Sequence, residues 1–269
     1  MWPWALLLSP LLAYSLILAF VYFAQTRLLF PAGSVLSAGP MPRHWRPLTL
    51  HAETGHRLHG VHVPPQAQGG DPLLILGFGG NAWNAESAAA FLHDLFPRAD
   101  VVVFHYRGYA PSEGSPSAAA LQADALAIHD LARQLFSDHR IVVVGFSVGS
   151  GVASYLAAHR PVDGLILVTP FDSLAEVASD QYPWLPVRSL LRHRMEPARD
   201  LGETKVPVAL IAAGADRLVR PIRAEALSGA VHNLVFYRTL AGASHNDIYD
   251  RQDFRATMQR ALEQLSADR

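Results

Sequence analysis

A serine flanked by glycines, between an apolar strand and a helix, is the feature that most constrains this chain. Residues 141–151 read Ile-Val-Val-Val-Gly-Phe-Ser-Val-Gly-Ser-Gly. The β-branched run predicts a buried strand, and the segment that follows predicts a helix. Gly145-x-Ser147-x-Gly149 fits the sharp turn that projects a serine hydroxyl, with glycines where strand and helix pass closely. Ser147 is our candidate nucleophile, although the pattern also fits a surface serine in an ordinary strand-to-helix turn.

The rest of the chain alternates short apolar strands with helical segments. This alternation predicts an α/β fold with a mostly parallel sheet that helices cover on both faces. An antiparallel hairpin of residues 47–51 and 58–63 precedes it. The strands are expected at residues 73–76, 101–105, 141–145, 165–168, 208–212 and 234–237, and the helices at 85–96, 117–136, 148–159, 222–227 and 247–266.

The first 26 residues carry no charged side chain. Residues 2–24 are long and apolar enough to cross a bilayer, and aromatic side chains stand at both ends. No basic segment precedes this stretch, as a cleaved signal peptide would require. It also lacks the polar face of a helix packed on a soluble core. We therefore expect an uncleaved transmembrane anchor over residues 1–26 that contacts the bilayer through residues 2–24.

Three arginines follow the anchor, at positions 27, 43 and 46. Because basic residues favour the cytoplasmic side of a membrane, they favour a cytoplasmic catalytic domain. Residues 27–46 are rich in proline and glycine and are expected to form a linker, and residues 47–269 are expected to form the α/β domain.

Residues 171–204 interrupt the alternation and are aromatic and basic. They follow a strand, at the sheet edge where ligands enter such folds. This insertion is expected to be either a short lid over the site or a solvated connector.

A serine nucleophile needs a base, and the base needs an acid to orient it. Asp216 follows the strand predicted at 208–212, and His245 follows the last predicted strand. The carboxyl ends of parallel strands meet at one sheet edge, so both residues are expected beside Ser147, in the chain order of hydrolases with this turn. Asp172 follows another strand and is the alternative acid. Asp247 is expected to cap the last helix.

The negative oxygen that forms during acyl transfer needs two backbone N–H donors. One is expected from Val148, directly after the serine. The other is expected from Asn81, in the glycine-rich loop that follows the strand at 73–76.

The same loop contains Gly77-x-Gly79-x-x-Ala82, which also fits a loose dinucleotide-binding pattern. Arg107, after the next strand, would then hold a 2′-phosphate. This interpretation leaves the Ser147 turn unexplained, and we therefore expect no bound cofactor.

Composition excludes several further classes of function. The formal net charge is −1, which gives no reason to expect a nucleic-acid partner. The absence of cysteine excludes disulfides, thiolate metal sites and a cysteine nucleophile. Four histidines lie at positions 51, 56, 59 and 62, but His59 and His62 would face opposite sides of one strand. We expect no metal site.

Together these motifs resemble the α/β-hydrolase superfamily, and within it a membrane-anchored branch whose eukaryotic members include protein depalmitoylases. The resemblance covers most of the chain: the anchor with residues 25–31, Gly80-Asn81-Ala82, residues 106–117, the Ser147 turn and the Asp216 and His245 loops. Tyr106-Arg107-Gly108-Tyr109 is its most branch-specific part. The branch usually has His-Gly-Asn where this chain has Gly79-Gly80-Asn81, so a histidine that braces the loop is missing.

The resemblance implies Ser147 as nucleophile, His245 as base and Asp216 as acid, with the amides of Asn81 and Val148 as oxyanion hole. We therefore expect a membrane-anchored serine hydrolase that cleaves ester or thioester bonds of hydrophobic or acylated substrates. A serine peptidase with the same three residues is one alternative. A membrane-tethered binding protein on a hydrolase scaffold is another.

Overall fold

The computed structural model describes residues 3–36, 39–66 and 71–267, so Met1 and Trp2 of the expected anchor lie outside the described residues. Within these ranges the chain forms an eight-stranded sheet in the order β1-β2-β4-β3-β5-β6-β7-β8. The strands are β1 (Arg46–His51), β2 (Arg57–Val63), β3 (Leu73–Phe78), β4 (Asp100–Phe104), β5 (Arg140–Phe146), β6 (Gly164–Val168), β7 (Val208–Ala213) and β8 (Leu234–Leu240).

β2 runs antiparallel to both of its neighbours, β1 and β4, and the other pairs are parallel. This arrangement confirms the expected hairpin and the mostly parallel sheet. The chain leaves β3 towards β4 on one side, whereas β5 pairs with β3 on the other side. The strand order therefore reverses between β3 and β5, and such a reversal opens a crevice at the carboxyl ends of the strands.

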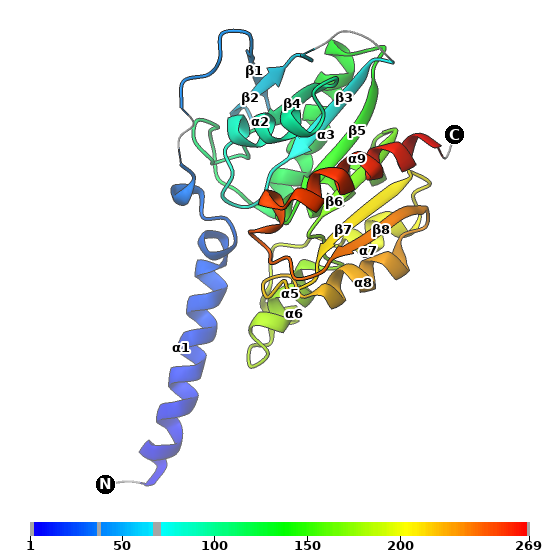
Figure 1. The fold of residues 1–269 in the computed structure, drawn as a ribbon. Coiled ribbons are helices and arrows are strands. Elements are labelled where there is room, and N and C mark those ends of the chain that lie inside the picture. Colours follow the sequence, from blue (N-terminus) through cyan, green and yellow to red (C-terminus); the bar gives the residue numbers. More distant parts are fainter. Residues whose placement is uncertain (1–2, 37–38, 67–70, 268–269) are drawn as a thin grey trace.

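Helices cover both faces of the sheet (Figure 1). Alternate residues of β3 serve the two faces: Leu74 and Leu76 pack into one buried cluster and Ile75 into the other, as the two-residue period of a strand requires. α2 (Ala85–Leu95) and α9 (Gln252–Ala267) cover one face, and α3 (Ala118–Leu135), α4 (Val148–His159) and α8 (Pro221–Ala230) cover the other. The central strands β3, β5, β6 and β7 are buried on both sides, which explains their continuous apolar runs.

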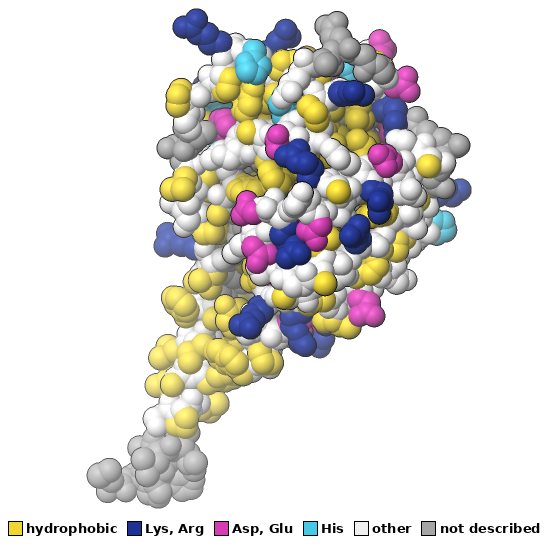
Figure 2. All heavy atoms as spheres, in the orientation of Figure 1, with side chains coloured by type: hydrophobic (Ala, Val, Ile, Leu, Met, Phe, Trp, Pro, Cys, Tyr) yellow, Lys and Arg dark blue, Asp and Glu magenta, His cyan; other side chains and the backbone are white. Residues whose placement is uncertain are grey.

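The N-terminal helix α1 (Pro3–Leu29) projects away from this body (Figure 1). Hydrophobic side chains are exposed along it (Figure 2). Ser9–Leu29 is long and apolar enough to cross a membrane, and only 6% of its apolar window is buried. That low burial excludes a core helix. α1 ends at Leu29, later than the anchor boundary expected at residue 26, because no proline or glycine interrupts the segment before Pro31.

The insertion contains three short helices, α5 (Leu174–Gln181), α6 (Val187–Leu190) and α7 (Pro197–Gly202). These helices are too short for a helical period to stand out in the sequence.

The expected start of the last helix at Asp247 was wrong, because that helix begins at Gln252. The Asp247 carboxylate instead accepts a hydrogen bond from the Ser244 N–H at 2.8 Å, and the short 3₁₀ helix η2 (Ile248–Asp250) follows.

Candidate active site

Ser147 lies at the sharp turn between β5 and α4. Its φ of 51° and ψ of −118° lie outside the regions that non-glycine residues prefer, a strain of order 1–3 kcal/mol that the surroundings must hold. The Ser147 N–H donates to the Val168 carbonyl at 2.9 Å, and the Ser147 carbonyl accepts from the Ser150 N–H at 2.8 Å. The backbone on both sides of the serine is therefore fixed.

The two glycines of the turn are required by close contact. A Cβ at Gly149 would lie 2.2 Å from the Phe78 carbonyl oxygen of β3, and one at Gly145 would lie 2.5 Å from the Gly149 carbonyl oxygen. Backbone atoms of β3, β5 and α4 thus meet at this turn, as the spacing Gly145-x-Ser147-x-Gly149 predicts.

His245 joins Ser147 to Asp216. The Ser147 hydroxyl lies 2.9 Å from His245 Nε2, and His245 Nδ1 lies 2.6 Å from Asp216 Oδ2. An ionised carboxylate only accepts hydrogen bonds, so Nδ1 carries the ring proton and Nε2 of the neutral imidazole accepts the Ser147 hydroxyl proton. The three side chains expected to act together are in direct contact.

Asp216 is held in place by the backbone that follows it. Its Oδ1 accepts from the N–H groups of Leu218 and Val219 at 2.8 and 2.9 Å, and only 5% of the residue is exposed. Asp172, the alternative acid, instead pairs with Arg223 at 3.2 Å, and burial raises the pKa of its carboxyl. Asp216, not Asp172, contacts His245.

The loop after β3 lies beside the serine. A Cβ at Gly80 would stand 3.9 Å from the Ser147 Cβ, and Asn81 lines the same cavity as Ser147 and Val148. The Asn81 side chain is already engaged, since Nδ2 donates to the Leu29 carbonyl at 2.7 Å and Oδ1 accepts from Tyr109 at 2.8 Å. The role of its backbone amide as an oxyanion donor stays a prediction. Val148 opens α4, where the first amides of a helix lack helical partners.

Two tyrosines brace this loop. The Tyr106 hydroxyl donates to the Gly79 carbonyl at 2.7 Å, and the Tyr109 hydroxyl donates to Asn81. Burial raises the pKa of both phenols, so both remain protonated donors at neutral pH. The Tyr-Arg-Gly-Tyr stretch was noted in the sequence, but its bracing role follows only from the structure.

Thr169 and Tyr249 are further neighbours of the site that the sequence did not reveal. Thr169 follows β6 with a φ of 46°, an outlier for a β-branched residue, and it is 2% exposed. Burial raises the pKa of Tyr249 to about 12 and the Asp216 carboxylate adds to this, whereas a hydrogen bond with Thr169 opposes it. The positive φ of Thr169 has no signature in the sequence.

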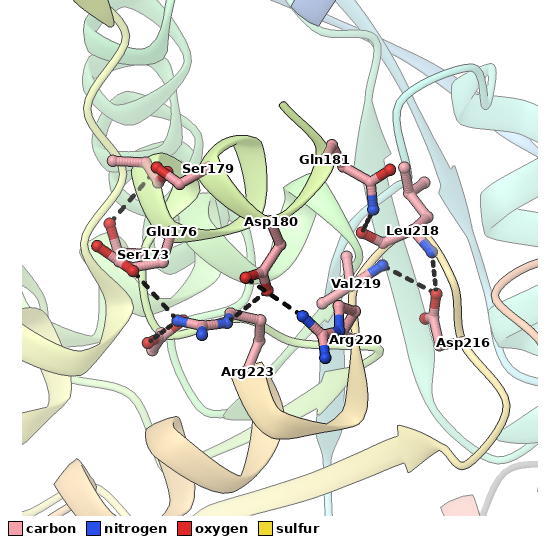
Figure 3. Close-up of polar contacts among 12 residues, drawn as sticks. Ser173, Glu176, Ser179, Asp180, Gln181, Asp216, Leu218, Val219, Arg220 and Arg223 are labelled. Atoms are coloured by element: carbon pink, nitrogen blue, oxygen red, sulfur yellow. Dashed lines mark hydrogen bonds and ion pairs between the residues drawn. The ribbon is translucent and has the colours of Figure 1, made fainter. Parts of the chain in front are cut away.

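Part of the insertion is tied to the loop that carries Asp216 (Figure 3). Gln181, at the end of α5, donates from Nε2 to the carbonyls of Arg217 and Leu218 at 2.7 and 2.9 Å. Arg223 of α8 also pairs with α5, through Asp180 at 2.9 Å and Glu176 at 3.4 Å. α5 therefore has a fixed position relative to Asp216.

The insertion and α1 enclose a cavity of about 400 Å³ in which Ser147 is exposed. No charged side chain lines it among the residues that the structure describes. This size lies within the range of small-molecule sites, about 300–1,000 Å³. Its lining consists of Val21, Gln25, Leu28, Leu29, Phe30, Asn81, Ser147, Val148, Phe171, Leu174, Val177, Ala178, Gln181, Tyr182, Trp184, Leu185, Val187, Leu190, Leu191, Leu218 and Val219.

Two of the residues considered for a dinucleotide or a metal, Arg107 and His62, have other partners. Arg107 forms a buried ion pair with Asp124 and donates to Thr54 at 2.7 Å, so its guanidinium is engaged away from the loop after β3. His62 pairs with Asp100 at 2.6 Å. Over the described ranges, no group of three or more histidine, aspartate or glutamate side chains could hold a metal ion.

Comparison with known proteins places this geometry in a family. A family model described as alpha/beta hydrolase fold matches residues 72–192. The uncharacterized protein Rv2307c of Mycobacterium tuberculosis is 37% identical over 238 residues, 86% of this chain and 84% of that protein. The chain belongs to the α/β-hydrolase superfamily.

Two further comparisons are a short match to a lipase and a likeness of fold to an esterase. The lysophosphatidylserine lipase ABHD12 of Danio rerio is 36% identical over 96 residues, which are 32% of this chain and 25% of that protein. The crystal structure of the Pyrococcus furiosus esterase Pf2001 shares the fold with a TM-score of 0.70 at 15% identity, over 86% of this chain and 96% of that one.

The close contacts at the turn predict that Gly149→Ala destabilises the protein. The new Cβ would displace backbone, so we expect the free energy of unfolding to fall by about 1–3 kcal/mol or more. Gly229→Ala is the matched control, because Gly229 is exposed in α8 with nothing within 4 Å of an added Cβ. It should stabilise α8 by roughly 0.5–1 kcal/mol. Denaturant unfolding of the full chain in detergent measures both. Equal stability of the two variants would contradict the packing described.

Proposed function

We propose that this protein is a serine hydrolase that cleaves ester or thioester bonds through an acyl-enzyme. The observation that carries the proposal is the unbroken contact from Ser147 through His245 to Asp216, at 2.9 and 2.6 Å. His245 takes the Ser147 proton as the hydroxyl oxygen attacks the acyl carbonyl. Asp216 orients the imidazole and stabilises its protonated form.

The amides of Val148 and Asn81 then donate to the negative oxygen of the tetrahedral intermediate. Such preorganised donors contribute about 2.7–4 kcal/mol each to lowering an acyl-transfer barrier. His245 next gives its proton to the leaving alcohol or thiol, which departs. A water molecule, deprotonated by His245, attacks the acyl-serine. His245 then returns this proton to the Ser147 oxygen as its bond to the acyl carbon breaks and the acid is released.

The cavity favours hydrophobic acyl groups. Burial of hydrocarbon is favourable by about 0.8 kcal/mol per methylene, whereas a charged acyl group would have no counter-charge among the lining side chains. The lipase activity in the name of the Danio rerio relative also supports ester hydrolysis, over the 25% of that protein that is matched.

We further propose that α1 anchors the enzyme in a membrane as a single span. Its length, its apolar character and its low burial support this role. The arginines at positions 27, 43 and 46 lie on the side of the catalytic domain, and they favour the cytoplasm for that domain.

Fluorophosphonate labelling tests the nucleophile. These reagents react with an activated serine, so the wild-type chain should be labelled and Ser147→Ala should not be. Ser150→Ala is a control in the same turn and should still be labelled. The Ser150 hydroxyl is buried and donates to the Ser147 carbonyl at 2.6 Å, so it is not the hydroxyl that reacts. Equal labelling of wild type and Ser147→Ala would refute the proposal.

The two acidic residues should differ sharply in their effect on turnover. Asp216→Asn should lower kcat by about 10²–10⁴-fold, because an amide at this position favours the wrong imidazole tautomer. Asp172→Asn should change kcat less than tenfold, because its partner Arg223 keeps Glu176 and Asp180. Initial rates on p-nitrophenyl butanoate provide the comparison, and the reverse ranking would move the acid to Asp172.

A further inference from the structure

The cavity that contains Ser147 has one wall made by the helix that we propose as the membrane anchor. Val21, Gln25, Leu28 and Leu29 of α1 line it. Their spacing of four, three and one residues places them on one face of the helix. The opposite wall is the insertion, which contributes Tyr182, Trp184, Leu185 and others.

α1 is fixed against the insertion by polar contacts. Gln25 is 4% exposed; its Oε1 accepts from the Arg192 N–H at 2.8 Å and its Nε2 donates to the Leu190 carbonyl at 3.3 Å. Nearer the N-terminus, the Tyr14 hydroxyl donates to the Trp184 carbonyl at 2.9 Å. The wall is therefore held at two levels along the helix.

The same helix is tied to the reacting groups at its other end. Asn81 Nδ2 donates to the carbonyl of Leu29, the last residue of α1. From Ser147 outward, the wall thus runs from Leu29 back to Val21. Eight residues at 1.5 Å each make this wall ~12 Å long. An extended chain covers roughly 1.2 Å per bond, so the wall matches about ten bonds of an acyl chain.

The mouth of the cavity is apolar and exposed. Leu28, Tyr182, Trp184 and Leu218 all line the cavity, and between 51% and 61% of each is exposed. Tyr14, which contacts the backbone of Trp184, lies inside the candidate span Ser9–Leu29. Because the mouth is apolar and lies at the level of this span, it would face the apolar layer around α1.

We propose that α1 is part of the substrate site: the substrate is a membrane-resident ester whose acyl chain lies along α1, between it and the insertion. The inference rests on the serine-hydrolase function proposed above. A lipid in the adjoining leaflet has its ester towards the surface and its chain towards the bilayer centre. The cavity has the same direction, with Ser147 at the Leu29 end and Val21 deeper in the span. Val21 then sets how much of the chain is bound.

Chain-length preference of the full chain in phosphatidylcholine vesicles tests this proposal. With p-nitrophenyl esters, kcat/KM referred to the free aqueous ester should rise up to about ten carbons and then level off, because each methylene moved from water into the cavity contributes a gain of roughly fourfold. Val21→Trp places an indole in the deep end of the cavity. It should lower the decanoate-to-butanoate ratio of kcat/KM by about tenfold or more, since several methylenes lose their site.

Phe23→Trp is the matched control, since Phe23 is 76% exposed on the outer side of α1. It should leave the ratio unchanged. An unchanged ratio in Val21→Trp, whether neither rate falls or both fall equally, would overturn the role of α1. If Ser147→Ala meanwhile abolishes butanoate hydrolysis, the serine mechanism stands and only the inference about α1 falls. If Ser147→Ala keeps that activity, the proposed function itself fails.

Discussion

The parallel pairing of β3, β5, β6, β7 and β8 is the constraint on which the rest of the structure depends. Parallel strands end at a common edge, so the loops after β3, β5, β7 and β8 converge although up to 164 residues separate Asn81 from His245. The reversal of strand order between β3 and β5 leaves room there for a ligand. The hydrogen bonds between Ser147, His245 and Asp216 are a consequence of this shared edge.

Close packing at the turn fixes the position and the backbone conformation of Ser147 at that edge. Gly145 and Gly149 allow β3, β5 and α4 to approach so closely that no side chain fits between them. Ser147 is held in an unfavourable conformation because its N–H is bonded to Val168 and its carbonyl to Ser150. Three aromatic rings support the turn from the face of α2 and α9. They belong to Trp83, Phe146 and Tyr249, and their ring centroids lie 5.2–5.9 Å apart. Strain at the serine is thus balanced by packing around it.

The sequence predicted those parts of the fold that have a local chemical signature. The apolar runs marked the strands, and the glycine spacing marked the turn, because both reflect requirements of neighbouring residues. The bracing of Asn81 by Tyr109 and the positive φ of Thr169 depend on contacts between distant segments, so no local sequence pattern predicts them. The role of Asp247 was mistaken for the same reason: an aspartate before a helical segment fits a cap, but its carboxylate closes the turn that holds His245.

α1 and the insertion link the site to its proposed environment. Contacts of Gln25 and Tyr14 join α1 to the insertion, and Gln181 joins the insertion to the Asp216 loop. Asn81 completes these contacts, because its side chain donates to the last residue of α1 and the residue lines the cavity. The proposed anchor, the walls of the cavity and the reacting groups therefore form one connected set of contacts.

The central claim is that an acyl group is carried on Ser147 during turnover. The most direct measurement is mass spectrometry of the chain after rapid acid quenching of a reaction with p-nitrophenyl decanoate. The account predicts a decanoyl adduct on the peptide that contains Ser147 in the wild type and no adduct at this position in Ser147→Ala. No adduct at Ser147 during active turnover by the wild type, or an adduct on another residue that turns over, would contradict it.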